Sequence, residues 1–276
     1  MSIATEPATD RMVFRKTNAH LGRKITVSPG NSANRHLSYG RVILNRSTPS
    51  VSFDNGDQET GLIVLSGEAT IRTAGEETRL GQYDAMYIPR DSHVQVSTSS
   101  AVDVAEFSAG VENTYPLQVV RFAEISEDPG LRFTTGNQAS QRHLHLLLAK
   151  NVQAGRLVIG FTYSEPGNWT SWPPHEHTKL LEEMYVFFDM PAPAYAVQLV
   201  YNNTECPELV TVVRDGDAVL IPGGFHPNVS VPNHRVCFLW AMAAHREAED
   251  RHYGVVNIQP GFDQGSSGLE KGRAQK

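Results

Sequence analysis

Short apolar or alternating runs recur along most of the chain, and a turn signal bounds each of them. The first series covers residues 50–53, 61–66, 69–73, 85–89 and 101–107, with Gly- and Asp-rich turns between the runs. Short strands at this spacing are typical of a β-sandwich or β-barrel. Few stretches have the period of an amphipathic helix. The pattern therefore predicts an all-β protein.

A second series follows the same order as the first. Its runs are residues 143–148, 156–163, 183–188, 195–200, 209–213, 218–221, 228–231 and 236–242. The sequence GQYD, then AMYIP, then His93 in the first series corresponds to DGD, then AVLIP, then His226 in the second. This weak internal repeat predicts two copies of one β-barrel in tandem.

The repeat divides the chain into five parts. We expect an N-terminal barrel over residues 13–115, a connection over 116–141 and a C-terminal barrel over 142–263. The polar segment 1–12 is predicted to be flexible, and the polar tail 264–276 to be disordered.

Net charge, cysteine spacing and the N-terminal sequence indicate which partners and which cell compartment to expect. The formal net charge is -6 and no basic run is present, which argues against a nucleic-acid or anionic-membrane partner but not against a small anionic substrate. Cys206 and Cys237 lack metal-site spacing, so we expect free thiols. The N-terminus has no apolar signal region and no run is long enough to span a membrane, which predicts a cytoplasmic protein.

The stretch 167–188, GNWTSWPPHEHTKLLEEMYVFF, holds the strongest candidate for chemistry. His175 and His177 are two residues apart, so in an extended chain both side chains point to one face. A carboxylate from the following strand could join them, and a Pro-Gly-Gly turn delivers His226 much later in the chain. Three imidazoles and one carboxylate suit one divalent metal ion per chain, with Zn or Mn favoured and Fe or Ni also compatible.

Two adjacent glutamates compete for the carboxylate position. The motif resembles that of the cupin superfamily, whose general spacing would select Glu182, whereas alignment on the following MYVFF strand selects Glu183. Strand parity then places Glu183 on the same face as Tyr185 and Phe187, and Glu182 on the other. We predict that Glu183 is the ligand. Glu182 is expected to be exposed or to lie behind the ligands.

Other histidines are weaker candidates. His93 stands where His226 stands in the second series, but only Asp54, Asp57 and Glu59 precede it, so we predict no metal in the first barrel. His143 and His145 form another H-x-H without a downstream carboxylate. Of these two, His145 is the better candidate to face the pocket.

These motifs resemble the cupin superfamily, in the arrangement of a tandem two-cupin protein. The second half is similar to the 5-deoxy-glucuronate isomerase family of inositol catabolism, which is related to the 4-deoxy-5-keto-uronate isomerases of pectin breakdown. The matching segments are PGNWTSWPPHEH (166–177), LEEMYVFFDMP (181–191), VVRDGDAVLIPGGFHP (212–227) and FLWAMA (238–243), with GLIVLSGEATI (61–71) and DAMYIP (84–89) in the first half.

The resemblance implies a metal-dependent aldose–ketose isomerase of a deoxy-hexuronate. The implied reaction interconverts 5-deoxy-D-glucuronate and 5-dehydro-2-deoxy-D-gluconate through a cis-enediolate, and it requires a base that moves a proton between C1 and C2. Three residues are candidates for that base: Glu182, His145 and Tyr185.

Substrate binding adds further candidates. Arg142 or Lys179 could bind the carboxylate of a uronate, since a cation is needed there. Gln198 and Tyr185 could contact sugar hydroxyls.

Three alternatives to this function stay open. The chain could isomerise another sugar acid, such as a 4-deoxy-5-keto-uronate. It could be a cupin Fe(II) dioxygenase, because fold and ligands would be the same. It could also bind a sugar acid without turnover. Edge strands at the barrel rims favour a homo-oligomer in each case.

Overall fold

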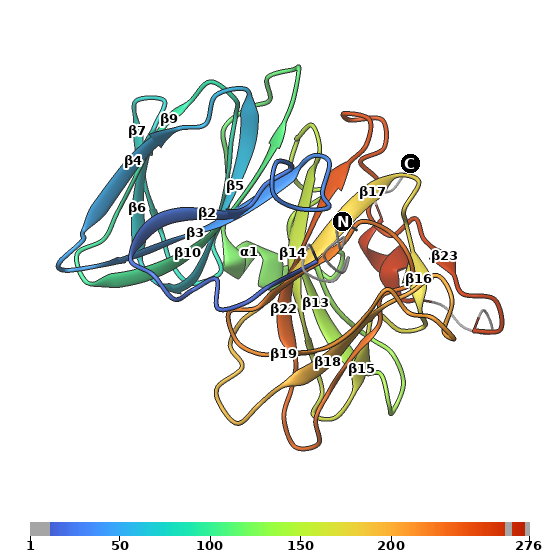
Figure 1. Cartoon of the computed structure of the whole chain (residues 1–276). Coiled ribbons are helices and arrows are strands. Elements are labelled where there is room, and N and C mark those ends of the chain that lie inside the picture. The colour runs from blue at the N-terminus through green and yellow to red at the C-terminus, as the bar shows by residue number, and fades with distance from the viewer. Residues whose placement is uncertain (1–11, 263–266, 274–276) are drawn as a thin grey trace, which may run out of the picture.

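The computed structural model describes residues 12–262 and 267–273, and in this part the chain is almost entirely β-strand (Figure 1). The described residues contain the short α-helix α1 (Phe122–Glu127) and the 3-10 helix η2 (Leu269–Gly272). The predicted all-β class is therefore confirmed. No helix among the described residues is long and apolar enough to cross a membrane.

The first half of the chain forms two antiparallel sheets. The larger has the strand order β11-β8-β5-β10-β3-β2, and the smaller has the order β4-β9-β6-β7. Their strands are β2 (Gly22–Val27), β3 (Leu37–Asn45), β4 (Ser50–Asp54), β5 (Gln58–Gly67), β6 (Ala69–Thr73), β7 (Glu76–Leu80), β8 (Ala85–Ile88), β9 (His93–Ser97), β10 (Ala101–Gly110) and β11 (Gln118–Val120).

The second half repeats this plan with larger sheets. A seven-stranded sheet has the order β1-β20-β17-β22-β14-β13-β12, a four-stranded sheet the order β15-β21-β18-β19, and β16 pairs with β23. The strands are β1 (Val13–Phe14), β12 (Arg132–Thr135), β13 (Arg142–Leu148), β14 (Leu157–Ser164), β15 (Trp169–Thr170), β16 (His175–Glu176), β17 (Leu181–Phe187), β18 (Ala196–Val200), β19 (Leu209–Val213), β20 (Ala218–Ile221), β21 (Asn228–Ser230), β22 (Cys237–Ala244) and β23 (Asn257–Ile258).

The alternation of side-chain directions along β5 explains how the two halves of the chain pack together. Leu62 and Val64 belong to the core between the two sheets of the first half, whereas Ile63 and Leu65 belong to a core shared with the second half. Successive side chains of a strand point to opposite faces. A continuous apolar run such as GLIVL is therefore buried on both faces, and the six-stranded sheet lies between its own smaller sheet and the second half.

Some boundaries differ from the sequence-based expectation. Val13 and Phe14 pair with β20 of the second half and not with the N-terminal unit in which we placed them. The connection 116–141 is shared between the halves, because β11 pairs with β8 and β12 pairs with β13, with α1 between them (Figure 1).

The predictions for the two ends of the chain can be compared with the structure only where the residues are described. The expected disorder of the tail is wrong for residues 267–273, which contain η2 and contact the second half. The rest of the tail from 274 onwards, and 264–266, lie outside the described residues, as does the N-terminal segment 1–11. Met12 is buried. Cys206 is exposed and Cys237 buried, and both are free, as predicted.

Two buried glutamates connect the halves reciprocally. Glu59 on β5 accepts hydrogen bonds of 2.6–2.8 Å from the backbone N–H groups of residues 155–157. Glu182 on β17 accepts hydrogen bonds of 2.7–2.8 Å from the backbone N–H groups of residues 35–37. Both side chains are almost fully buried. The expectation that Glu182 is exposed or lies behind the metal ligands is therefore wrong, because its carboxylate serves the other half.

The register shows that these glutamates are equivalent. Thr60 lies opposite Ile88 of AMYIP, and Glu183 lies opposite Ile221 of AVLIP. The preceding residues, Glu59 and Glu182, therefore occupy the same place in the repeat. We refer to the two sets of hydrogen bonds as the glutamate clamps.

We predict that Glu182→Ala lowers the free energy of unfolding by about 3 kcal/mol, because three backbone donors lose a charged acceptor at once. Glu182→Gln keeps one acceptor oxygen and should lose less. Urea unfolding followed by circular dichroism measures both. The control is Glu68→Gln, at an exposed glutamate. An alanine variant as stable as the wild type would show that the clamp contributes nothing.

Candidate metal centre

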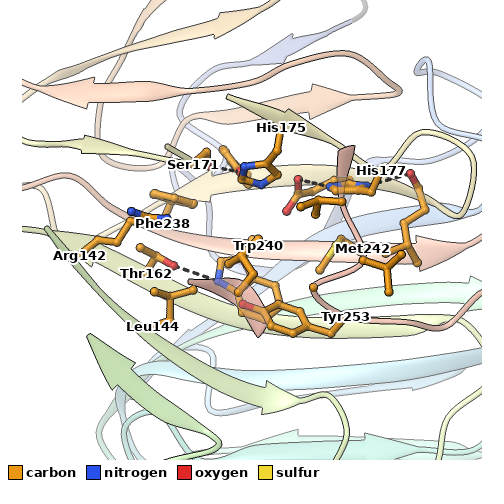
Figure 2. Close-up of a pocket in the computed structure, with 17 residues that line it drawn as sticks. Arg142, Leu144, Thr162, Ser171, His175, His177, Phe238, Trp240, Met242 and Tyr253 are labelled. Atoms are coloured by element: carbon orange, nitrogen blue, oxygen red, sulfur yellow. Dashed lines mark hydrogen bonds and ion pairs between the residues drawn. The ribbon is translucent and has the colours of Figure 1, made fainter. Parts of the chain in front are cut away.

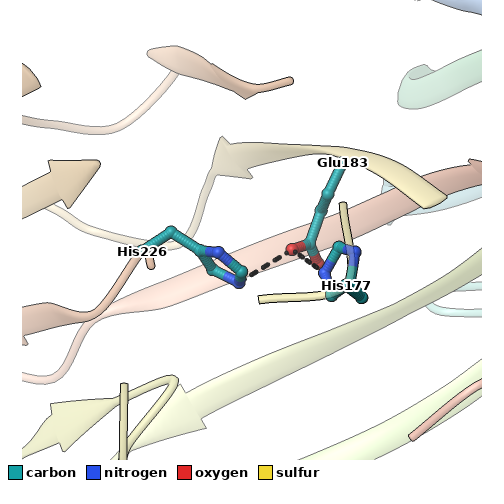
Figure 3. A group of neighbouring side chains, drawn as sticks. All are labelled: His177, Glu183 and His226. Carbon is teal, nitrogen blue, oxygen red and sulfur yellow. Dashed lines mark hydrogen bonds and ion pairs between the residues drawn. The ribbon is translucent and has the colours of Figure 1, made fainter. Parts of the chain in front are cut away.

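The structure brings three of the four predicted ligands together. The ligand atoms of His177, Glu183 and His226 all lie within 4.8 Å of one another, and all three residues are buried (Figure 3). His177 follows β16, Glu183 lies on β17, and His226 lies between β20 and β21. As strand parity predicts, Glu183 reaches the cluster and Glu182 points to the other face.

The hydrogen bonds of the three histidines fix which ring nitrogen faces the site. Nδ1 of His175 lies 2.9 Å from the Pro173 carbonyl, and the Nδ1 atoms of His177 and His226 lie 3.2 and 2.8 Å from the carbonyls of Leu181 and Gly224. A backbone carbonyl only accepts, so Nδ1 carries the hydrogen in each ring. In the neutral ring each Nε2 then has a lone pair, which is the form that binds a metal.

The arrangement of Glu183, His177 and His226 requires a positive charge between their ligand atoms. Oε2 of Glu183 lies 3.0 Å from Nε2 of His177 and 3.1 Å from Nε2 of His226. Nε2 of His226 is buried and makes no hydrogen bond. Two imidazole lone pairs directed at a carboxylate repel it unless a proton or a metal ion lies between them. The residues therefore fit a divalent metal ion.

Burial alone would lower the pKa of His177, but the hydrogen bond and charge of Glu183 outweigh burial and raise that pKa, so a proton can supply the positive charge that a metal ion would supply. Burial alone would raise the pKa of Glu183, but the hydrogen bond and charge of His177, with a smaller contribution from His226, outweigh burial and lower the pKa to about 2. Burial, with the neighbouring His226, lowers the pKa of His175 to about 3. The glutamate is therefore ionised and His175 is neutral at physiological pH.

His175, the fourth predicted ligand, lies beside the cluster of three. Its ring centroid is 5.1 Å from that of His226, and its side chain lines the same pocket (Figure 2). β16, which carries His175, is held by pairing with β23. The structure therefore groups three of the four predicted ligands and places His175 next to them in the pocket lining.

Arg142 lines the same pocket and carries a buried, uncompensated charge. It is 2% exposed and donates to the carbonyls of Ser140, Trp172 and Ser267. Among the described residues no acidic side chain pairs with it. Burial lowers its pKa to about 10, so the guanidinium stays protonated at neutral pH. Figure 2 shows Arg142 on the side of the pocket away from His177.

Tyr185 is the one candidate for the base that lies in this pocket. Its hydroxyl is 2.6 Å from the Ser171 hydroxyl, and burial raises its pKa well above 10. The phenol is therefore protonated, and it can donate a hydrogen bond to a substrate oxygen.

The other two candidates for the base lie elsewhere. Glu182 forms a glutamate clamp. His145 lies on β13 three positions after Arg142, so the two side chains point to opposite faces of the sheet. Its ring stacks on Phe161 at 4.3 Å, in a different cavity. The expectation that His145 faces this pocket is wrong.

Lys179 and Gln198, predicted to contact substrate, also lie outside the lining. Lys179 is exposed in the turn between His177 and β17. Gln198 is buried, and its amide nitrogen donates to the backbone carbonyl of His226 at 3.0 Å. Gln198 therefore holds the segment that delivers His226.

Several lining residues were not identified from the sequence. Thr162 and Trp240 share a hydrogen bond of 3.1 Å, and alternation along β14 and β22 could have placed both on the inner face. Gly160 allows this packing, because a Cβ there would lie 2.2 Å from the Trp240 ring. Tyr253 and Leu269 come from the segment after the last long strand, where no periodic signal exists.

The corresponding place in the first half has different residues. Thr60 stands where Glu183 stands in the second half, and the Asn55 amide donates to its hydroxyl at 3.3 Å. His93 is exposed and pairs with Asp54 at 2.7 Å. Among the described residues the one cluster of potential metal ligands is that of the second half.

Comparison with solved structures identifies the type of fold. An IolB-like protein from Salmonella typhimurium LT2 superposes with a TM-score of 0.79 at 20% identity, covering 91% of this chain and 98% of that one. A variant of oxalate decarboxylase from Bacillus subtilis gives 0.61 at 11% identity, over 83% and 76% of the chains. A cupin 2 conserved barrel domain protein from Leptotrichia buccalis gives 0.50, at 11% identity over 82% and 89%. These likenesses show a cupin-like all-β fold.

The sequence comparisons then identify the family. Residues 13–254 match the KduI/IolB family, and the chain belongs to it. It is 26% identical to a 5-deoxy-glucuronate isomerase from Geobacillus kaustophilus, over 80% of this chain and 84% of that protein. It is 27% identical to a 4-deoxy-L-threo-5-hexosulose-uronate ketol-isomerase from Opitutus terrae, over 78% and 82%. The resemblance inferred from the motifs is confirmed, and both relatives belong to the predicted class, the isomerases.

We predict that the purified protein contains one divalent metal ion per chain, measured by inductively coupled plasma mass spectrometry. Glu183→Gln and His226→Ala should each lose most of it, since each removes a ligand that the remaining side chains cannot replace. His143→Gln is the matched control, because His143 lies on the opposite face of the sheet. Full metal content in a Glu183→Gln, His226→Ala double variant would contradict the site.

Proposed function

We propose that this protein is a metal-dependent aldose–ketose isomerase that interconverts 5-deoxy-D-glucuronate and 5-dehydro-2-deoxy-D-gluconate in myo-inositol catabolism. The observation that carries the proposal is the presence of two features in one pocket. One is a cluster fit for a divalent metal, and the other is Arg142, a buried cation without a carboxylate partner among the described residues. A sugar acid needs both, at opposite ends of the molecule.

Arg142 would bind the substrate carboxylate. Three of its five N–H groups donate to carbonyls, which leaves two donors for a ligand. A buried guanidinium is costly without an anion, so a carboxylate arriving there gains a charge-assisted hydrogen bond and compensates the charge. This distinguishes a uronate from a neutral sugar.

The other end of the substrate would lie at the metal centre. His175, His177, Glu183 and His226 would hold a divalent ion, which supplies Lewis-acid polarisation of the carbonyl and its neighbouring hydroxyl. Because Glu182 and His145 lie outside this pocket and burial keeps Tyr185 protonated, the proton that leaves carbon as the cis-enediolate forms would pass to a water molecule in the pocket. Tyr185, oriented by Ser171, would donate a hydrogen bond to a substrate oxygen as charge develops there. The apolar side chains of Leu144, Phe238 and Met242 would exclude bulk water.

Residues 253–256 and Leu269, from the segment after β22, complete the lining of the pocket, and we refer to them as its roof. The enclosed space is about 50 Å³, smaller than the 300 Å³ or more of typical ligand pockets. We infer that this roof shifts when substrate enters. The two-residue pairing of β16 with β23 lies at its edge.

Three finer points complete the proposal. We propose that each half is a cupin barrel, so that the chain is a tandem bicupin. The similarity to the ketol-isomerase from Opitutus terrae makes its 4-deoxy-5-keto-uronate substrate the second candidate. We also propose that the chain forms a homo-oligomer.

The direct test is proton NMR of the metal-loaded protein with 5-deoxy-D-glucuronate in heavy water. We expect ketone product only with metal present, and deuterium next to the carbonyl. A metal-stripped sample and His226→Ala are the controls. If the sugar is unchanged with metal bound, the assigned substrate is wrong, and 4-deoxy-5-keto-uronates are tested next. Oxygen consumption by the iron-loaded protein would instead favour a dioxygenase.

A pair of variants tests whether Arg142 binds the substrate carboxylate. We predict that Arg142→Gln lowers kcat/KM for the uronate about 100-fold, because the carboxylate loses a charged partner. Lys179→Gln should change it less than about twofold. The same variants are assayed with 5-deoxy-D-glucose, which lacks the carboxylate, to separate recognition from misfolding. An equal loss for both sugars in Arg142→Gln would contradict carboxylate binding.

A further inference from the structure

A second cavity, of about 300 Å³, lies on the other face of the seven-stranded sheet, between the two halves. Tyr83 comes from the first half, Phe122 from α1, and Phe161 and Tyr163 from β14. The ring centroids of Tyr83 and Phe161 are 4.9 Å apart, and those of Tyr83 and Phe122 are 5.2 Å apart. We call this cavity the inter-half pocket. Its size and aromatic wall suit a compound of one or two rings.

His145 is a buried polar group in this pocket that the proposed mechanism does not use. It is 2% exposed, and its ring stacks on Phe161. Its Nδ1 is buried without a hydrogen-bond partner, and Nε2 bonds to no described residue. Burial, with a smaller contribution from Arg132, lowers the pKa of the imidazole to about 4. The ring is therefore neutral and has an N–H free to donate to a ligand.

Among the described residues around the pocket, one arginine has no ion-pair partner. Arg235 lines it but is ion-paired with Asp189, and its guanidinium lies over the Tyr163 ring at 5.3 Å. Arg132 also lines it; this arginine is exposed, and its side chain has no hydrogen bond or ion pair with any described residue. Glu127 shares a neighbouring hollow with Arg132 but makes no ion pair with it. One free guanidinium matches a ligand with a single negative charge.

We propose that the inter-half pocket is a second binding site, specific for a small planar aromatic carboxylate. The ring of the ligand packs against Tyr83, Phe122 and Phe161. Its carboxylate accepts hydrogen bonds from Arg132 and from the neutral imidazole of His145. Aromatic packing selects the planar ring, and the guanidinium selects the anion.

The site is separate from the candidate metal centre although both use the same strands. On β13, Arg142 faces the metal pocket and His145 faces the inter-half pocket; on β14, Thr162 and Phe161 are divided in the same way. Binding here does not depend on the proposed isomerase activity. The two proposals can therefore fail independently.

Isothermal titration calorimetry of the metal-loaded protein with 2-naphthoate tests this site. We expect saturable binding of one molecule per chain, and about tenfold weaker binding of the uncharged 2-naphthamide. Arg132→Gln and His145→Phe should each weaken 2-naphthoate binding about tenfold, the second while keeping the stacked ring. Arg72→Gln, at an exposed arginine of β6, and Arg142→Gln should leave the affinity unchanged.

Three results would overturn the proposal. The first is the absence of saturable binding at millimolar 2-naphthoate. The second is equal affinity for 2-naphthoate and 2-naphthamide, which would remove the role of the anion. The third is loss of binding in Arg142→Gln but not in Arg132→Gln, which would place the ligand in the metal pocket. Melting curves of the His145→Phe variant separate weakened binding from unfolding.

Discussion

The glutamate clamps are the interaction on which the arrangement of the site depends. A buried carboxylate is costly, and each clamp offsets that cost with three backbone N–H donors from the other half. On β17 the clamp residue Glu182 is followed directly by Glu183. A slip of one residue would exchange their faces, moving the ligand out of the metal pocket. The first half therefore fixes the register of the strand that carries the ligand.

The same physical rule explains what the sequence could and could not predict. Period-two alternation is local, so it correctly separated Glu183 from Glu182 and predicted an all-β chain. It also forbids Arg142 and His145 from facing the same pocket, a consequence that was available from the sequence. No local rule places Lys179, Gln198 or the roof. Their positions depend on a turn, on a bond to the backbone of a distant segment, and on a stretch without periodicity.

Short-range backbone contacts orient the candidate ligands, whereas two of the three contacts that hold Arg142 are long-range. The carbonyls that orient His175, His177 and His226 lie two to four residues away in the chain. This part of the site follows from the local loop sequences. Arg142 instead joins the segments of Ser140, Trp172 and Ser267, the last close to Leu269 of the roof. Under the proposed function, a carboxylate on the two remaining N–H groups would share the guanidinium with these carbonyls, which couples substrate binding to the position of the roof.

The two halves share an equivalent buried glutamate and a similar arrangement of strands. Among the described residues, only the second half has the cluster of candidate metal ligands. Glu59 and Glu182 occupy equivalent positions and do the same work, but the next residue is Thr60 in one half and Glu183 in the other. At Thr60 a hydroxyl bonded to the Asn55 amide takes the place of a metal ligand, and His93 is exposed at the surface. The first half thus contributes a clamp, a shared core and one wall of the inter-half pocket. Because its large sheet is apolar on both faces, it can support the second half closely enough to hold the register of β17.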